Sequence, residues 1–165
     1  GCWHQPCVIG AGDAAAVTLA HSGGLAVAVA FDERLRCGVD IERRRRPVGD
    51  VVRHETTADE TAWAEAGGVG EAETRWLLLW TAREAIGKCL GVGLLLSGRA
   101  LATRDWRPSG DGWRAAAREA GPLGIRSLET PQWVASLAVP EEVVDQPAFV
   151  AVCRALGREL SGARR

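Results

Sequence analysis

Two acidic side chains stand one residue apart in a stretch that otherwise has the pattern of a buried strand. In CGVDIERRRRP, residues 37–47, alternation places Asp40 and Glu42 on one face of the strand and Val39 and Ile41 on the other. The two carboxylates therefore point the same way. Taken alone, the pattern is also explained by a strand with one hydrated face, in which Glu42 pairs with one of the arginines that follow.

A third acidic residue lies on a long predicted helix further along the chain. Residues 71–90 carry apolar side chains at helical spacing, and Thr81, Glu84 and Lys88 form a stripe beside that apolar band. An ordinary pair between Glu84 and Lys88, four residues apart, also explains the stripe. Gly87 costs the helix about 1 kcal/mol relative to alanine, which indicates close approach by another group.

If this helix packs across the strand, the three acidic residues converge. Two carboxylates about 4 Å apart repel each other by roughly 4 kcal/mol at an effective dielectric constant near 20. Such a group needs a cation, and oxygen-only donors favour Mg²⁺, which also binds substrate phosphates. We therefore predict a Mg²⁺ site formed by Asp40, Glu42 and Glu84, with Lys88 and Arg83 as phosphate partners.

The sequence HSGG, residues 21–24, adds a candidate phosphate contact upstream. Its glycines allow backbone N–H groups to approach an anion closely, and His21 and Ser22 can donate hydrogen bonds from their side chains. Taken alone, however, these four residues are better explained as a tight turn.

The order HSGG, GVDIE and WTAREAIGK resembles the 4'-phosphopantetheinyl transferase superfamily, particularly its surfactin-synthetase-activating type. Its motifs read approximately S-H-S, (I/V)G(I/V)D(I/V)E and W(S/C/T)xKE(A/S)xxK, and the resemblance extends from Val17 to Pro140. Arg83 stands where the family usually has lysine. Family members also have most of a first lobe before S-H-S, whereas only 20 residues precede His21 here. The resemblance implies that residues 1–36 are the remnant of a first lobe and residues 37–165 a catalytic lobe.

The reaction that the resemblance implies is Mg²⁺-dependent transfer of the 4'-phosphopantetheine arm of coenzyme A. The acceptor is a serine of an apo acyl or peptidyl carrier protein in polyketide or nonribosomal-peptide biosynthesis, and adenosine 3',5'-bisphosphate is released. By motif position, the metal-binding residues are Asp40, Glu42 and Glu84. Glu84 also helps to deprotonate the serine, directly or through a metal-bound water. Lys88 neutralises charge on the pyrophosphate, and phosphate of the nucleotide half is held by His21 with Ser22.

Two other functions stay open. The first is a non-catalytic relative that binds a carrier protein or coenzyme A, which the short first lobe favours. The second is an enzyme that reuses the fold for other chemistry, because a fold does not fix a reaction. The short first lobe also leads us to expect a homo-oligomer, in which a second copy completes the coenzyme A cleft. Arg43 to Arg46 would steer an acidic carrier protein or else form a solvated face.

Local patterns predict an α+β fold, an antiparallel sheet with helices packed on one face. A hairpin is expected over residues 25–42, and helices over 58–66 and 71–90. Further strands are expected in residues 99–108, 111–119, 133–140 and 149–156.

Composition limits the class of protein. A chain of 165 residues with 47% hydrophobic and 25% charged residues is typical of a single soluble globular domain. Five cysteines, an odd number without a CxxC pair, argue against a disulfide framework or a zinc site and favour a cytoplasmic location. No apolar run approaches the roughly 20 residues that cross a bilayer, so we expect no membrane partner. A net charge of -1 gives no reason to expect a nucleic-acid partner.

Overall fold

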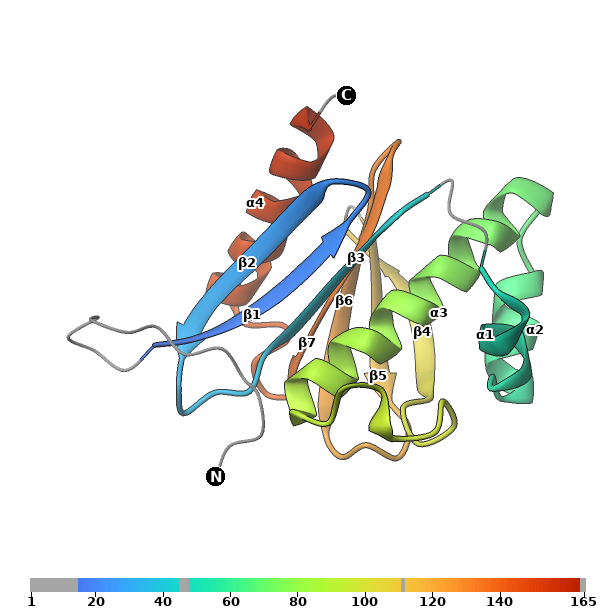
Figure 1. Ribbon diagram of the computed structural model, residues 1–165, viewed down its shortest axis with the longest axis horizontal. Helices are drawn as coiled ribbons and strands as arrows, with labels where there is room; N and C mark the ends of the chain where they lie inside the picture. Colours follow the sequence, from blue (N-terminus) through green and yellow to red (C-terminus); the bar gives the residue numbers. More distant parts are fainter. Residues whose placement is uncertain (1–14, 45–47, 111, 164–165) are drawn as a thin grey trace.

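The computed structural model describes residues 15–44, 48–110 and 112–163 (Figure 1). The strands are β1 (Ala15–Ser22), β2 (Leu25–Asp32), β3 (Gly38–Arg43), β4 (Thr103–Ser109), β5 (Gly112–Ala117), β6 (Leu123–Glu129) and β7 (Trp133–Pro140). The helices are α1 (Asp50–His54), α2 (Ala58–Glu65), α3 (Val69–Leu90) and α4 (Pro147–Gly162), with a 3₁₀ turn η1 (Gly93–Leu95). The predicted α+β class is confirmed.

The chain enters the described structure as a two-stranded hairpin. Strands β1 and β2 are antiparallel and are joined by Gly23 and Gly24, with φ values of +52° and +82°. Two positive φ angles in a two-residue loop are what a type I′ turn requires, and glycine adopts them without strain. The hairpin predicted over residues 25–42 is therefore wrong, because β2 pairs with β1 and not with β3.

The other five strands form one antiparallel sheet in the order β3-β7-β6-β5-β4. Strand β3 lies at an edge and pairs along its length with β7, which places Asp40 opposite Ser136. The hairpin borders this edge, where the backbone N–H of Val39 donates to Oγ1 of Thr18 at 3.2 Å. The division of the chain at residue 36 stays a prediction.

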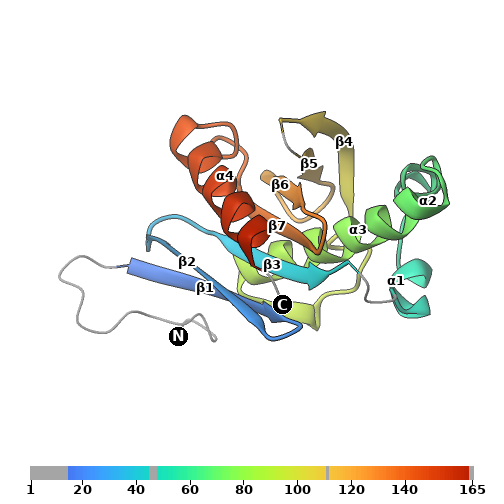
Figure 2. The same ribbon diagram turned by 90° about the horizontal axis from the view of Figure 1, so that it is seen from above.

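The two faces of the sheet are buried by different elements (Figure 2). On one face, Cys37 and alternate residues of β3 and β7 pack against α4 and the inner side of β2. The strand residues are Val39, Ile41, Ala135, Leu137 and Val139. The opposite face packs on α3, through Ala138 against Ala85 and Ile86, and through Val134 against Leu77 and Leu78. Both faces of β3 are thus buried, and its acidic residues do not lie on a hydrated face.

Residues 149–156, predicted as a strand, lie in α4. Pro147 occupies the first turn of this helix, where its fixed φ suits helix initiation. The buried side chains of α4, Phe149, Cys153 and Leu160, recur at helical spacing. The β-branched valines of this segment gave it the composition of a strand, but the spacing of its apolar residues decides in favour of the helix.

Helix α3 lies against β3 at two glycines. A Cβ at Gly38 would collide with the carbonyl oxygen of Ala85, so only glycine allows the helix to come this close to the strand. Gly87 was expected to mark a close approach, and the approaching group is the carbonyl oxygen of Gly93 in the turn after the helix. Gly91, with φ of +71°, caps the C-terminus.

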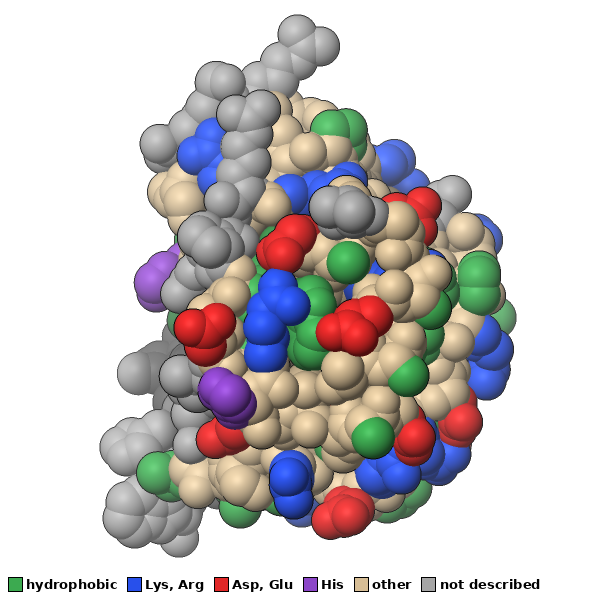
Figure 3. All heavy atoms as spheres, turned by 90° about the vertical axis from the view of Figure 1, so that its right-hand side faces the viewer, with side chains coloured by type: hydrophobic (Ala, Val, Ile, Leu, Met, Phe, Trp, Pro, Cys, Tyr) green, Lys and Arg blue, Asp and Glu red, His purple; other side chains and the backbone are tan. Residues whose placement is uncertain are grey.

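Charged side chains of both signs are interspersed on the side of the molecule that carries α1 and α2 (Figure 3). None of the helices in the described residues is long and apolar enough to span a membrane. Three described cysteines, Cys37, Cys89 and Cys153, are buried free thiols.

Candidate functional site

Asp40 and Lys88 meet where α3 crosses the edge strand. Two residues before Asp40, Gly38 lets the helix lie directly on this face of β3. The Nζ atom of Lys88 lies 2.8 Å from Oδ1 of Asp40 and donates a second hydrogen bond to the carbonyl oxygen of Val39 at 3.1 Å. The helix and the strand are therefore tied together at the centre of the two sequence motifs.

The Asp40 carboxyl group is buried and is only partly satisfied. The residue is 7% exposed, and its Oδ2 atom has no hydrogen-bond partner among the described residues. Burial raises the pKa of Asp40 to about 7, Lys88 opposes that rise, and the charges of Glu84 and Glu42 add to it. Glu42 and Glu84, two of the acidic residues predicted to converge, thus lie near enough to affect the ionisation of Asp40.

Glu42 links the site to the hairpin. It is 5% exposed, and its Oε2 atom accepts a hydrogen bond from Oγ of Ser22 at 2.6 Å. Ser22 is the last residue of β1 and immediately precedes the Gly23–Gly24 turn. The structure therefore brings one residue of the HSGG motif to the acidic pair of β3.

His21 does not point the same way as Ser22. Successive strand residues face opposite sides, and His21 is exposed on the outer face of the hairpin. His21 and Ser22 were predicted to hold phosphate together. In this structure their side chains project from opposite faces of the hairpin.

A chain of buried hydroxyl groups lies beside the site, between α3 and the sheet. Oγ1 of Thr81 lies 2.7 Å from Oγ of Ser136, which lies 2.8 Å from Oγ of Ser127. Ser136 stands directly opposite Asp40 in the strand pairing. Sequence reasoning placed Thr81 on the same helix stripe as Lys88 but missed Ser136; the available signal was one polar residue inside the apolar strand WVASLAVP.

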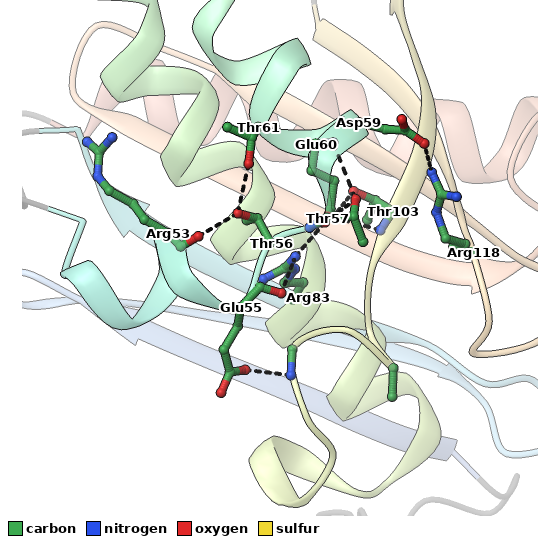
Figure 4. A network of polar contacts seen from close by, with 12 residues as sticks. Arg53, Glu55, Thr56, Thr57, Asp59, Glu60, Thr61, Arg83, Thr103 and Arg118 are labelled. Atoms are coloured by element: carbon green, nitrogen blue, oxygen red, sulfur yellow. Dashed lines mark hydrogen bonds and ion pairs between the residues drawn. The ribbon is translucent and has the colours of Figure 1, made fainter.

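Arg83 points toward the start of α2, where it contacts Glu60 (Figure 4). Its side chain is 4% exposed, and its Nη2 atom lies 2.6 Å from Oε2 of Glu60, which is itself 1% exposed. A further, longer hydrogen bond runs from Nη2 to the carbonyl oxygen of Glu55. The structure does not bring Arg83 to the acidic site, so we propose no phosphate contact for it.

Glu60 is the centre of this second cluster and was missed by sequence reasoning. Its Oε1 atom accepts hydrogen bonds from the backbone N–H and from Oγ1 of Thr103, both at 2.8 Å. Its Oε2 atom also accepts from the backbone N–H of Thr57, which completes a capping box at the start of α2. The Thr-x-x-Glu spacing signalled the cap, but nothing local indicated that Arg83 and Thr103 would share the carboxylate.

Of the four arginines from Arg43 to Arg46, one is held by hydrogen bonds and one is exposed. Nη2 of Arg44 donates to Oγ1 of Thr74 at 2.8 Å and its Nη1 to the carbonyl oxygen of Thr130, so Arg44 is held in place. Arg43 is exposed at the end of β3. Arg45 and Arg46 lie outside the described residues.

The predicted metal can be tested against the donor groups. Among the described residues, no group of three or more His, Cys, Asp or Glu side chains is arranged as a metal centre. Asp40 nevertheless presents a buried carboxylate oxygen that lacks a partner within the described ranges, with Glu42 and Glu84 nearby. Mg²⁺ is commonly held by one or two carboxylates and several waters. The donor chemistry therefore fits Mg²⁺, although the three carboxylates do not form a preassembled set.

Comparison with known families identifies one match. The model of the 4'-phosphopantetheinyl transferase superfamily matches residues 36–127, which contain β3, α3 and the Asp40–Lys88 contact. A search of curated proteins found no match.

Proposed function

Since the chain belongs to the 4'-phosphopantetheinyl transferase superfamily, we propose that it is an enzyme of the surfactin-synthetase-activating type. It transfers the phosphopantetheine arm of coenzyme A to a serine of an apo acyl or peptidyl carrier protein. The observation that carries this proposal is the Asp40–Lys88 contact. A buried acid with one unpartnered oxygen is joined there to a lysine, with two further acids close by.

The proposed reaction exchanges one phosphorus–oxygen bond for another. The serine oxygen of the carrier protein bonds to the phosphorus that bears pantetheine, and the bond from that phosphorus to the bridging oxygen breaks. Adenosine 3',5'-bisphosphate leaves with the bridging oxygen. The serine proton must be removed, and half-buried Glu84 is our candidate for its acceptor.

The partial exposure of Lys88 supports a role for it at the leaving group. Its side chain is 29% exposed although its Nζ atom contacts Asp40, so its charge faces both the buried acid and the solvent. We propose that this charge stabilises the negative charge that develops on the departing phosphate. His21 is proposed to contact phosphate from the outer face of the hairpin, whereas Ser22 donates its hydroxyl hydrogen to Glu42 and would have to exchange that partner to bind phosphate.

Asp40, Glu42 and Glu84 are the residues that would hold Mg²⁺. When bound, the cation supplies positive charge to the pyrophosphate. The raised pKa of Asp40, about 7, means that acidic conditions protonate this ligand and weaken cation binding.

The proposal extends to the partner and to the location of the protein. Exposed Arg43 would steer an acidic carrier protein electrostatically. The free thiols of Cys37, Cys89 and Cys153 are compatible with a cytoplasmic location.

A non-catalytic relative that binds coenzyme A or a carrier protein is the second candidate. The observation in its favour is that the described residues contain no preassembled set of three metal-ligating side chains. Under this alternative, Lys88 and Asp40 would form a permanent structural pair.

Mass spectrometry of an apo carrier protein incubated with this chain, coenzyme A and Mg²⁺ separates the two candidates. We expect the carrier protein to gain the mass of one phosphopantetheine arm, in an amount that grows with time. Calorimetric binding of coenzyme A without any gain of mass would favour the non-catalytic relative. An unchanged carrier protein together with no binding of coenzyme A would overturn both.

A further inference from the structure

The face of the sheet opposite α3 is only partly covered. Helix α4 packs against β3, β7 and β6 through the core that contains Phe149 and Cys153 (Figure 2). Beyond this core, a cavity of about 610 Å³ lies between α4 and strands β4, β5 and β6. Asp40 faces α3 on the other side of the sheet, so this cleft is separate from the proposed reaction site.

Three arginines stand in a row across this face. Arg107 on β4 is directly opposite Arg114 on β5, which is directly opposite Arg126 on β6. Residues that are directly opposite in antiparallel strands share a face, and like charges in that relation destabilise a sheet. The row therefore carries an electrostatic cost in the absence of anions.

Acidic side chains form ion pairs with two of the three arginines in the row. Arg114 lies 2.5 Å from Oε1 of Glu141, and Asp145 contacts Arg114 at 3.4 Å and Arg126 at 2.6 Å. Arg107, which is exposed, has no ion pair within the described part of the chain. Positive charge on the row thus exceeds the negative charge that contacts it.

Of this row, Arg126 lines the cleft, and helix α4 adds two more arginines on the opposite wall. Arg154 and Arg158 are one helical turn apart, are exposed, and line the cleft. Neither forms an ion pair with any residue in the described ranges. The only acidic residue among the described lining residues is Glu129, whose Oε1 atom accepts a hydrogen bond from Nε1 of Trp113.

The cleft combines this charge with hydroxyl and apolar groups. Arg126 extends along its floor, where its Nη1 atom donates to Oγ of Ser109 at 3.1 Å. Leu128 and Val150 provide an apolar wall. The volume is within the range of small-molecule sites, roughly 300–1,000 Å³.

We propose that the cleft between α4 and strands β4 to β6 is a second ligand site, which binds a small molecule carrying one or more phosphate groups and an apolar or aromatic portion. Planar guanidinium groups bind phosphate oxygens in pairs, and Arg154 and Arg158 supply them from the α4 wall. The nitrogens of Arg126 donate to Val144, Ser109 and Asp145, so Arg126 contributes positive charge to the floor of the cleft but no open pair of donors. The apolar side chains receive the uncharged portion of the ligand. A cleft of this size favours a small ligand over a nucleic acid or a protein.

Calorimetric titration with ATP as the probe tests this site on the full chain. Replacing both Arg154→Ala and Arg158→Ala should weaken ATP binding by about tenfold or more, because each removes a charge-assisted hydrogen-bonding group. Arg99→Ala, at an exposed position outside the cleft, is the matched control and should change the affinity less than about twofold. Because all three arginines are exposed, the melting temperatures should equal that of the parent chain.

Two further measurements distinguish this cleft from other sites. Amide NMR signals of Gly157 and Ser161 should shift on addition of ATP, and they should shift equally in a Lys88→Ala background. Adenosine, which lacks phosphate, should bind far more weakly than ATP. The proposal is overturned if the double variant binds ATP as tightly as the parent, if Lys88→Ala alone abolishes binding, or if adenosine matches ATP. Tighter binding of an RNA or DNA oligonucleotide than of ATP would also overturn it.

Discussion

Lys88 and Asp40 form an ion pair of 2.8 Å between α3 and the edge strand β3, and the pKa of Asp40 is nevertheless raised to about 7. An adjacent lysine ordinarily lowers the pKa of a carboxyl group. Here burial has the larger effect, and the neighbouring charges of Glu42 and Glu84 act in the same direction as burial. The charges of Glu42 and Glu84 thus oppose the ionisation of Asp40, and a bound cation would lower that repulsion.

The raised pKa predicts a pH dependence of stability. In the folded chain Asp40 keeps its proton up to about pH 7, whereas in the unfolded chain it loses the proton near 3.8. The folded state thus binds the extra proton between these values, so the free energy of unfolding decreases as the pH rises through that window. The loss is at most roughly 4 kcal/mol. Asp40→Asn should remove this loss and melt at an equal or higher temperature than the parent at pH 8 without metal.

Urea unfolding at a series of pH values measures this effect. Asp59→Asn, at an exposed position on α2, serves as a control for general charge effects. A parent chain whose stability rises between pH 4 and 7, with no difference from Asp40→Asn, would contradict the assignment of a buried, proton-binding Asp40.

Gly38 should be intolerant of any side chain. Gly38→Ala places a methyl group against the backbone of α3 at Ala85, so helix and strand must separate. We expect a loss of at least about 1–3 kcal/mol in the free energy of unfolding. Gly49→Ala, where the added group meets no atom within 4 Å, is the matched control. Equal stability of the two variants in denaturant titration would show that α3 does not lie this close to β3.

The Glu60–Arg83 pair should contribute to stability and not directly to catalysis. Glu60→Ala leaves a buried guanidinium without its carboxylate, which costs about 3–5 kcal/mol. Glu65→Ala, at the exposed end of α2, should change stability by less than about 0.5 kcal/mol. If the Glu60→Ala chain unfolds like the parent but no longer binds coenzyme A, the structural role is contradicted and Arg83 must act in binding coenzyme A.

The sequence predicted well those features that depend on local pattern. Helix α3 and strand β7 were expected because their apolar residues follow helical and alternating spacing over long stretches. The motifs also identified Asp40 and Lys88, and the structure brings these two together. Strand β6 was missed, since Gly124, Arg126 and Ser127 interrupt its apolar pattern.

Contacts between residues far apart in the chain could not be predicted from local sequence pattern. Alternation in β2 and β3 indicated two strands but not their partners, so β3 was paired with its sequence neighbour although it pairs with β7. The Gly23–Gly24 turn was the local signal that β2 belongs with β1. Arg83 was placed at the site by motif position, whereas its partner Glu60 became evident only from the packing of α2 on α3.

The exposed apolar residues on the outer face of the β1–β2 hairpin lead us to predict self-association. Its directly opposed residues include Leu19 with Ala28 and His21 with Ala26, and Leu19 is 50% exposed. Strand β2 has no charged residue before Asp32, so its edge lacks a common protection against pairing with another strand. We predict a homo-oligomer whose coenzyme A affinity rises with protein concentration.

Sedimentation in parallel with coenzyme A titration tests this association. Leu19→Lys with Ala28→Lys should lower the sedimentation coefficient and weaken coenzyme A binding at the same protein concentration. The matched control is Val152→Lys, which alters an exposed apolar residue on α4. A parent chain that stays monomeric at all concentrations and binds coenzyme A would contradict the predicted oligomer.

The most direct test of the central claim compares arm transfer by the parent, Asp40→Ala and Glu84→Gln. Mass spectrometry of an apo carrier protein, with coenzyme A and Mg²⁺ in excess, gives the amount of arm transferred over time. We predict transfer by the parent and a loss of at least about 100-fold in both variants, with melting temperatures at or above the parental value. Transfer at the parental rate by either folded variant would contradict the assignment of the reaction to the site around Asp40 and Lys88.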